Sequence, residues 1–506
     1  MRWRPFVLIA AWALSCALGR AAPHSPGKAA DAVTELELRQ AEALLARQAS
    51  GEPSIAFERA RLALYRGDCD AALAILSSPA LASTPDTAAL RAVARGCAQA
   101  TAAAKIVEEQ GVWIRLQDGE DEVLVPWLVR VADDARRALA TELGVVLPRP
   151  LRIELVRDLF SLAALSGLPV TAAETTGTVG VARYGRVILV SPRATSLGYP
   201  WEDTLAHEMT HLALGRACRD RAPLWLQEGL AKLEEIRWRP PRPFDELRDH
   251  DSAARAALGS GQWVSLDQLG PSIALLPTPD RAMAAYAEVT SFVDYWLRKN
   301  GKPALELLLL DLRGTGDRGV DTALRSVTGY GLDRWQARWQ EHLASGSRST
   351  EVAPTPALPR GGVGDVARSV RLGDLLFQRG HYAAAAAELG TASRQAPRES
   401  SIRWRLSRAL DGAGHREEAV GRLGKVADLA GPHAGWFALS GRFAADAGDR
   451  QQAEAWFRVA IALDPLSVDA ACEGRWRPAE GTAQSSLPED PARRVLCAGA
   501  LRVPRD

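Results

Sequence analysis

An internal repeat of 34 residues constrains the fold of this chain more than any other feature. Small residues recur at this step at three offsets, and a larger apolar residue recurs at a fourth. The four series are Gly373, Ser407 and Gly441; Gly380, Gly414 and Gly448; Ala385, Ala419 and Ala453; and Leu389, Leu423 and Phe457. Pro397 and Pro465 lie two periods apart, and Pro432 is one residue out of register. Small residues at fixed offsets let paired helices pack closely, so the period predicts a stack of helix pairs.

This pattern resembles the tetratricopeptide repeat, in which each unit is a helix pair. The resemblance implies an all-α repeat domain over residues 365–468 that binds a protein partner. Residues 346–364 are rich in Ser, Pro and Gly, and they predict a flexible linker before the repeats. Residues 469–506 follow the last repeat, and we expect them to form a C-terminal cap or tail.

The residues before the linker predict an α+β fold. Residues 22–108 are rich in Ala and Leu with helical periodicity, which predicts an N-terminal helical cap containing a tetratricopeptide-like turn. Residues 109–240 mix short apolar strands with helices, and residues 241–345 are mainly helical. The strand signals are Val112–Leu116, Leu151–Val156 and a hairpin around Gly185.

The first 21 residues predict a secretory signal peptide. A basic start precedes an apolar run from Phe6 to Leu18 and a small-residue exit before Ala22. We therefore expect secretion across the inner membrane and a periplasmic or extracellular location. Cys16 raises the alternative of a lipoprotein, but Leu14 stands one place off the usual pattern, so we favour a chain without a lipid anchor.

The charge balance gives no sign of a nucleic-acid partner. Lys and Arg total 62, and Asp and Glu total 61, so there is no basic excess for a phosphate backbone. We expect no transmembrane segment in the mature chain, since no later apolar run reaches about 18 residues. Spacing leaves the cysteine pairing open: Cys69–Cys97 and Cys472–Cys497 are the close pairs, and Cys218 is left over.

The segment His207-Glu208-Met-Thr-His211 is a metal-site motif. On a helix, positions i and i+4 share one face, so both imidazoles reach the same ion. Glu208 is displaced around the helix, where it acts on a water molecule instead. Pro200 suits the start of such a helix and Gly215 its end. The motif therefore predicts that His207 and His211 bind Zn²⁺.

A second helix, starting near Pro223, supplies a third ligand. Glu228 lies 17 residues after His211, beside Trp225 and Gly229. An isolated carboxylate in such an apolar surround is costly, whereas a carboxylate paired with a cation is not. We therefore expect Glu228 to bind the same ion, and Gly229 to let this helix approach the first one closely.

The two helix motifs, HExxH and Trp225-Leu-Gln-Glu-Gly-Leu-Ala231, resemble the gluzincin metallopeptidases and, among them, the peptidase MA-like domain. The resemblance implies a zincin-like catalytic domain over residues 109–240, with residues 241–345 as its helical subdomain.

For the site, the resemblance implies that His207, His211 and Glu228 bind zinc and that Glu208 is the general base. Two imidazoles and one carboxylate leave a fourth position open, as catalytic zinc sites require. The resemblance also implies an oxyanion donor from the later subdomain. We assign this role to Tyr286, although an ordinary core tyrosine explains the residue equally well; His250 is a second candidate.

Two functions from different classes compete. The first is zinc-dependent hydrolysis of peptide bonds in a peptide or protein substrate, with the repeats binding a partner or the substrate. The strand at residues 178–182 is suited to pair with an extended peptide, although ordinary sheet packing explains it equally well. The second is an inactive repeat scaffold with a structural or vestigial zinc site. An intact Glu208 favours the peptidase, since a scaffold needs no general base. The Gly-x-Met-Glu-Asn motif of aminopeptidases is absent.

Overall fold

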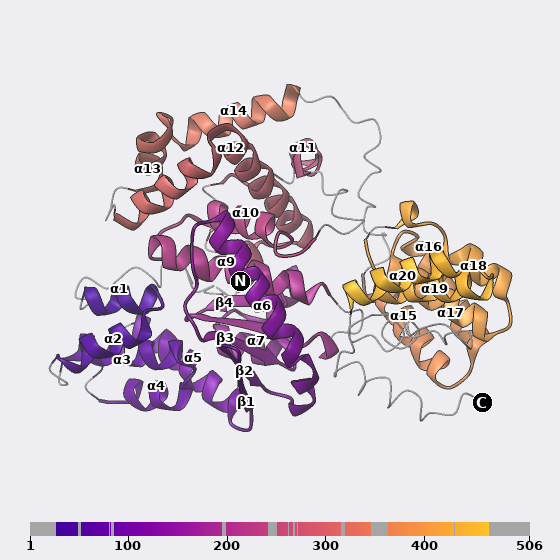
Figure 1. Ribbon diagram of the computed structural model, residues 1–506, viewed down its shortest axis with the longest axis horizontal. Helices are drawn as coiled ribbons and strands as arrows, with labels where there is room; N and C mark the ends of the chain where they lie inside the picture. The colour runs from indigo at the N-terminus through magenta and orange to yellow at the C-terminus, as the bar shows by residue number, and fades with distance from the viewer. Residues whose placement is uncertain are drawn as a thin grey trace, which may run out of the picture. The chain divides into compact units, whose positions relative to one another are not determined.

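The computed structural model describes residues 27–464, except for 49–51, 80, 82–84, 195–198, 241–249, 262, 267–268, 271, 315–318, 346–362 and 430. The chain divides into two compact units, with the boundary between residues 348 and 349. Most described residues are helical, and the first unit contains one small mixed sheet (Figure 1). The predicted signal peptide, most of the predicted linker and the tail with Cys472 and Cys497 lie outside the described residues.

The sheet has five strands in the order β1-β2-β3-β5-β4. Their bounds are β1 Lys105–Glu109, β2 Val112–Leu116, β3 Leu151–Val156, β4 Gly180–Arg183 and β5 Arg186–Val190. Strands β2, β3 and β5 are parallel, whereas β1 and β4 run antiparallel at the two edges. The two predicted strands and the predicted hairpin are confirmed. Strand β1 starts inside the segment expected to be helical.

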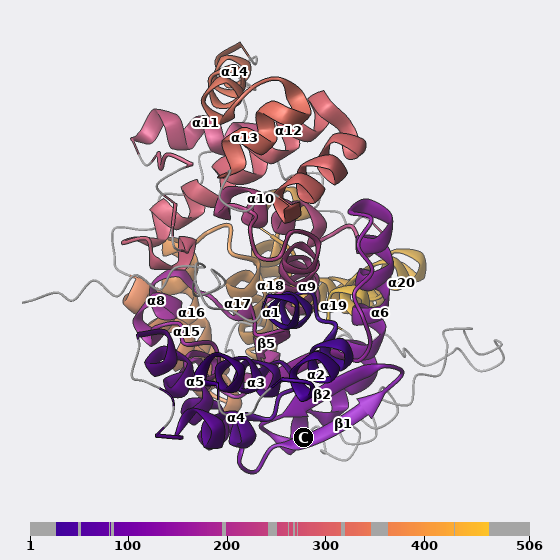
Figure 2. The ribbon, with the colours of Figure 1, turned by 90° about the vertical axis from the view of Figure 1, so that its left-hand side faces the viewer.

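Both faces of the sheet are covered, which explains why every residue of β5 is buried. Ile188 and Val190 pack with α7 (Leu159–Ser166) and the N-terminal helices. Leu189 points to the other face, toward Gly180 and α9. The N-terminal helices are α1 Lys28–Thr34, α2 Leu38–Ala46, α3 Pro53–Tyr65, α4 Cys69–Leu76 and α5 Pro85–Thr101. They lie beside the sheet (Figure 2). Since α3, α4 and α5 share one core with β3 and β5, they are an integral layer of the unit.

The remaining helices of the first unit cover the opposite face and extend beyond it. They are α6 Val125–Glu142, α9 Trp201–Cys218, α10 Leu224–Glu234, α11 His250–Ser260, α12 Pro279–Gly314, α13 Gly319–Thr328 and α14 Leu332–Ser345. Helix α8, Val170–Thr176, instead packs beside α7, and its Ala173 belongs to the core shared with the N-terminal helices. Short 3-10 turns span Gly119–Leu124, Pro192–Ala194 and Ile273–Leu275. Helix α12 kinks at Gly301, where φ is 76°. None of the described helices is both long and apolar enough to cross a membrane.

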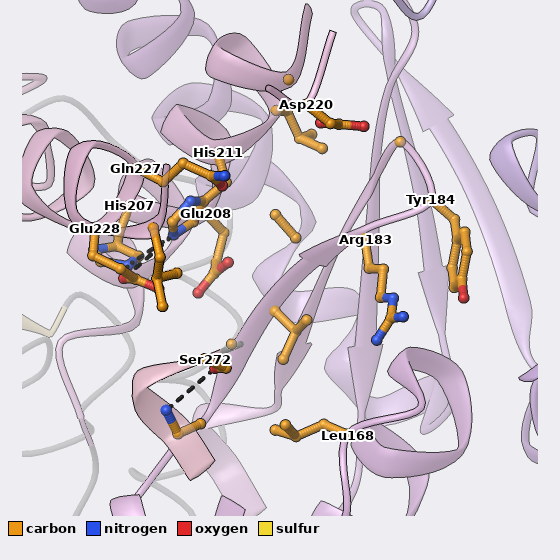
Figure 3. A pocket seen from close by; sticks show the side chains of 18 of the residues that line it. Leu168, Arg183, Tyr184, His207, Glu208, His211, Asp220, Gln227, Glu228 and Ser272 are labelled. Carbon is orange, nitrogen blue, oxygen red and sulfur yellow. Dashed lines mark hydrogen bonds and ion pairs between the residues drawn. The ribbon is translucent and has the colours of Figure 1, made fainter. Parts of the chain in front are cut away.

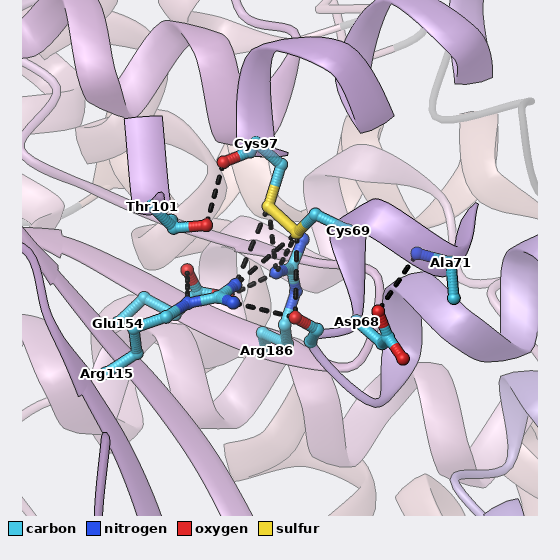
Figure 4. Close-up of a disulfide and its surroundings, with 9 residues drawn as sticks. Asp68, Cys69, Ala71, Cys97, Thr101, Arg115, Glu154 and Arg186 are labelled. Atoms are coloured by element: carbon cyan, nitrogen blue, oxygen red, sulfur yellow. Dashed lines mark hydrogen bonds and ion pairs between the residues drawn. A yellow bond between two sulfur atoms is a disulfide. The ribbon is translucent and has the colours of Figure 1, made fainter. Parts of the chain in front are cut away.

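A buried disulfide joins two of the N-terminal helices, and a buried ion cluster beside it belongs to the sheet (Figure 4). Arg115 of β2 links the two, since it donates a hydrogen bond to the Gly67 carbonyl at 2.7 Å. Cys69 on α4 pairs with Cys97 on α5, one of the two close pairs that the spacing left open, and Cys218 is free and buried. Glu154 on β3 accepts hydrogen bonds from Arg115 at 2.8 and 3.0 Å and from Arg186 on β5. Arg115 also lies 3.5 and 3.6 Å from the two sulfur atoms. One carboxylate thus faces two buried guanidinium groups.

The second unit consists of helix pairs of the kind that the 34-residue period predicts. The helices are α15 Val363–Gln378, α16 Tyr382–Gln395, α17 Ser400–Gly412, α18 Arg416–Leu423, α19 Ala434–Asp446 and α20 Arg450–Leu463, with a 3-10 turn at Val426–Asp428. The turn glycines Gly380, Gly414 and Gly448 have φ of 78°, 86° and 87°, a region that favours glycine. The second unit therefore contains helical repeats of the tetratricopeptide-like kind.

The small residues of the repeat lie where two helices approach each other. A Cβ atom on Gly373 would lie 2.5 Å from Leu389, and one on Gly441 would lie 2.8 Å from Phe457. At the equivalent position, the Ser407 hydroxyl donates a hydrogen bond to the Ala419 carbonyl at 2.7 Å. The period therefore reflects the close packing of the two helices in each pair.

We predict that Glu154→Gln destabilises the first unit by about 3–5 kcal/mol, because it leaves two buried guanidinium groups without a carboxylate. Glu122→Gln is the matched control: its exposed ion pair with Lys105 contributes less than about 1 kcal/mol. Urea unfolding of the full chain, followed by hydrogen exchange of β3 peptides, measures both. Equal losses in the two variants would contradict the role given to the cluster.

In the second unit, Gly441→Ala should destabilise α19 and α20 by about 1–3 kcal/mol, because the added methyl group collides with the Phe457 ring. Gly421→Ala serves as control, since a Cβ there meets nothing within 4 Å, and it should stabilise its helix by about 0.5–1 kcal/mol. Hydrogen exchange of the α19–α20 peptides gives the comparison. A neutral Gly441→Ala would show that the packing is looser than described.

Candidate metal centre

Two neighbouring helices bring His207, His211 and Glu228 together. The two histidines lie one turn apart on α9, and Glu228 lies on α10, which begins directly after Pro223. His207 Nε2 is 3.3 Å from His211 Nε2. Glu228 Oε2 is 3.6 Å from the first nitrogen and 3.7 Å from the second. Among the described residues, these three form a group whose ligand atoms all lie within 4.8 Å of one another (Figure 3).

This geometry fits a zinc ion. For ligand distances of about 2.0–2.1 Å, the edges of a tetrahedral site measure about 3.3 Å, close to the three separations observed. Glu228 Oε2 is buried and accepts no hydrogen bond within the described part of the chain. A buried carboxylate oxygen without a donor is unfavourable unless a cation lies against it. The residues present therefore fit the metal that the motif implies.

The electrostatics of the site also favour a bound cation. Burial alone would lower the pKa of His207, but the carboxylates of Glu228 and Glu235 outweigh it and raise that pKa to about 10. Burial alone would raise the pKa of Glu228, yet the positive charge of His211 and His207 lowers it. The site thus stabilises positive charge between the imidazoles and the carboxylates.

Glu208 lies beside the three ligands without joining them. Its side chain is buried, and desolvation raises its pKa despite the nearby charges of His207 and His211. A Cβ atom on Gly180 of the edge strand would lie 3.0 Å from Glu208 Oε1. Figure 3 shows the Glu208 carboxylate directed into the pocket, on a different side of α9 from Glu228. Glu208 therefore faces the pocket without being one of the three candidate ligands.

Tyr286 lines the same pocket from α12, whereas His250 does not. Burial raises the pKa of the Tyr286 phenol well above its usual range, with further contributions from the negative charges of Glu228 and Glu208. Lys232 Nζ lies 5.8 Å from the centre of its ring. The structure therefore brings together all five residues assigned from the sequence, and it places His250 elsewhere, at the start of α11.

One residue of the site, Glu235, was not predicted from the sequence. Its Oε2 lies 3.4 Å from His207 Nδ1, and Lys232 Nζ donates to its carboxylate at 2.8 and 3.0 Å. Glu235 follows Glu228 by two helical turns, so both carboxylates lie on one face of α10. A carboxylate on the second nitrogen of a metal-binding histidine fixes the orientation of the ring.

Gly229 has a role different from the one expected. A Cβ atom on it would lie 2.5 Å from Val293 Cγ2 and 2.6 Å from the Val289 carbonyl, both on α12. The glycine therefore allows α10 to approach α12 rather than α9. The close approach fixes α10, and with it Glu228, against the later helices.

Comparison of the chain with known proteins does not assign it to a family. No family model matches the chain, and no curated protein matches it. Among solved structures, the chain is similar to one chain of the APC/C hetero-tetramer Cut9–Hcn1, at 13% identity. The match covers 88% of this chain and 73% of that one, with a TM-score of 0.22. A similarity at this level carries no conclusion about function.

We predict that Glu235→Gln lowers zinc affinity about 10- to 100-fold, because the imidazole of His207 loses the carboxylate that orients it. Glu234→Gln, one residue earlier, is the matched control: its carboxylate pairs with Arg237 instead. Competition titration with a chromogenic chelator measures the affinity of both variants. If both variants bind zinc as the parent does, Glu235 has no influence on the site.

Proposed function

We propose that this chain is a zinc-dependent metallopeptidase of the gluzincin type, which hydrolyses peptide bonds. The observation that carries the proposal is the convergence of His207, His211 and Glu228 on one point, with Glu208 beside them in an open pocket. Three protein ligands leave room for a fourth, as in catalytic zinc sites, whereas structural sites are closed by four.

Each residue has a distinct part in the proposed reaction. His207, His211 and Glu228 hold the ion, and Glu235 orients His207. Zinc, when bound, would supply Lewis acidity that activates water and polarises the scissile carbonyl. Glu208 takes the proton from the attacking water and returns it to the leaving amine. The raised pKa of Glu208 suits a group that both accepts and returns a proton. Tyr286 is positioned on the pocket wall to donate a hydrogen bond to the developing oxyanion.

In this proposal, a peptide substrate binds by pairing with strand β4. It is an edge strand, and its residues Gly180, Val181, Ala182 and Arg183 line the pocket that contains the metal ligands. An extended peptide added to such an edge gains backbone hydrogen bonds. The glycine at position 180 allows β4 to lie close to Thr204 and Glu208 of α9, where a Cβ atom would come within 3.0 Å of both.

The competing proposal, an inactive scaffold with a structural metal site, is less well supported. A structural site needs neither a buried carboxylate beside the ligands nor a pocket open to it. We further propose that the repeat unit binds a protein partner or the substrate protein. Export to the periplasm or extracellular space is also part of the proposal, and the Cys69–Cys97 disulfide supports it, since such bonds persist in oxidising compartments.

The decisive variants are Glu208→Gln and Glu228→Ala. The first should retain zinc and lose about 10²–10⁴-fold in hydrolysis rate, because the amide keeps the size of the side chain but cannot accept the proton. The second should lose zinc, since it removes a ligand and its charge. Bound zinc is measured by elemental analysis and hydrolysis with a broad peptide library.

Three outcomes would count against this account. Normal hydrolysis by Glu208→Gln would remove the general base. Full zinc content in Glu228→Ala would place the third ligand elsewhere. A zinc-loaded parent that cleaves nothing in the library would favour the scaffold.

A further inference from the structure

The pocket at the metal centre extends well beyond the ligands, to the N-terminal helices. Its wall includes Arg61 and Tyr65 of α3, Tyr184 and Gly185 of the β4–β5 turn, and Asp220. Figure 3 shows Asp220 on the same side of the pocket as His211, past the metal ligands. The far end of the pocket therefore has charged side chains that the proposed chemistry does not use.

The backbone after α9 sets the position of Asp220. The helix ends at Cys218, and both Arg219 and Asp220 are left-handed, with φ of 56° and 57°. The Asp220 amide donates to the Gly215 carbonyl at 3.2 Å, which folds the segment back over the last turn. A Cβ atom on Gly215 would lie only 2.4 Å from Asp220 Oδ1. Since Gly215 follows His211 by four residues, about 6 Å along the helix axis, the carboxylate beside Gly215 lies roughly one helical turn beyond that ligand.

The Asp220 carboxylate has no hydrogen-bond or ion-pair partner among the described residues. The positive charge of Arg61 acts on Asp220, but this guanidinium donates to both oxygens of Glu58, at 2.8 and 3.0 Å, and to the Thr34 hydroxyl at 3.2 Å. Figure 3 shows the guanidinium of Arg183 directed away from Asp220, toward Leu168. Arg61 is thus already paired with the Glu58 carboxylate.

Asp220 is exposed to solvent and lies on the wall of the pocket, so a charged group that enters the pocket can reach its carboxylate. A carboxylate without a cation of its own attracts a positive group that comes within hydrogen-bond distance. An ammonium or guanidinium group that enters the pocket would supply the missing partner through charge-assisted hydrogen bonds.

We propose that Asp220 is a specificity residue that binds a positively charged group of the substrate, close to the bond that is cleaved. The charged group is either a Lys or Arg side chain or the free amino terminus of the peptide. This inference rests on the proposed peptidase function and adds the class of substrate: peptides with a cationic group one helical turn from the metal ligands.

The test compares Asp220→Asn with the parent on paired peptides. One pair differs only by Lys against norleucine at positions flanking the cleaved bond, and the other by a free against an acetylated amino terminus. Asn adopts left-handed conformations readily, so the fold should persist. We expect kcat/KM for the cationic member of one pair to fall at least about tenfold, while the neutral member changes less than about twofold and zinc content stays constant. The pair that responds identifies the source of the charge.

Asp70→Asn, which removes the same charge at an exposed position of α4, should leave both ratios unchanged. Equal losses on cationic and neutral peptides in Asp220→Asn, or unchanged ratios, would overturn the inference. If the zinc-loaded parent hydrolyses nothing, the proposed function fails, and binding of the same peptides by fluorescence anisotropy decides about Asp220. A preference for the cationic peptide that Asp220→Asn abolishes supports the site; no binding or no preference refutes it.

Discussion

The position of Glu228 against two imidazoles depends on how closely α10 packs between α9 and α12. Gly229 permits the contact with Val289 and Val293, and a series of aromatic rings extends it. Trp225 on α10 packs edge-on against Phe292 on α12, with ring centres 5.1 Å apart, and Phe292 packs against Trp339 on α14. The later helices thus act as a support that holds a buried carboxylate in place. Without these packing contacts, the cost of desolvating the Glu228 carboxylate would favour its exposure to water.

The opposite wall of the pocket is formed by other elements, namely α9, the edge strand β4 and the N-terminal helices. Helix α9 bears the histidines and Glu208, and the edge strand β4 runs beside it, close to Glu208 at Gly180. The N-terminal helices close the far end, where Tyr65 and Leu36 contact the β4–β5 turn at Gly185. The Cys69–Cys97 disulfide joins α4 to α5, and the helices contact the sheet through their shared apolar core and through Arg115 of the ion cluster around Glu154, which donates to the Gly67 carbonyl. A segment that is remote in sequence from the three candidate metal ligands therefore limits which groups fit into the pocket beside them.

Much of this arrangement follows from local patterns in the sequence. The apolar strands, the two site helices and the 34-residue period have strong signals, since each depends on periodic burial or on small residues at fixed offsets. Strand β1 was missed because its exposed, charged residues show no apolar alternation; only its backbone pairs with β2. Glu235 has the right spacing from Glu228, but the same spacing is typical of an ordinary charged helix face. The position of Asp220 depends on the left-handed backbone of Arg219 and Asp220. The sequence does not predict this conformation, because neither residue is Gly or Asn.

The central claim is that His207, His211 and Glu228 hold one zinc ion and leave its remaining coordination open. Anomalous diffraction from crystals of the zinc-loaded protein, with data collected on both sides of the zinc absorption edge, locates the ion directly. The account predicts one strong peak within about 2.0–2.2 Å of both histidine Nε2 atoms and of a Glu228 oxygen, with Glu208 outside ligand distance. A peak coordinated by a fourth protein side chain, or zinc bound only at other residues, would contradict it.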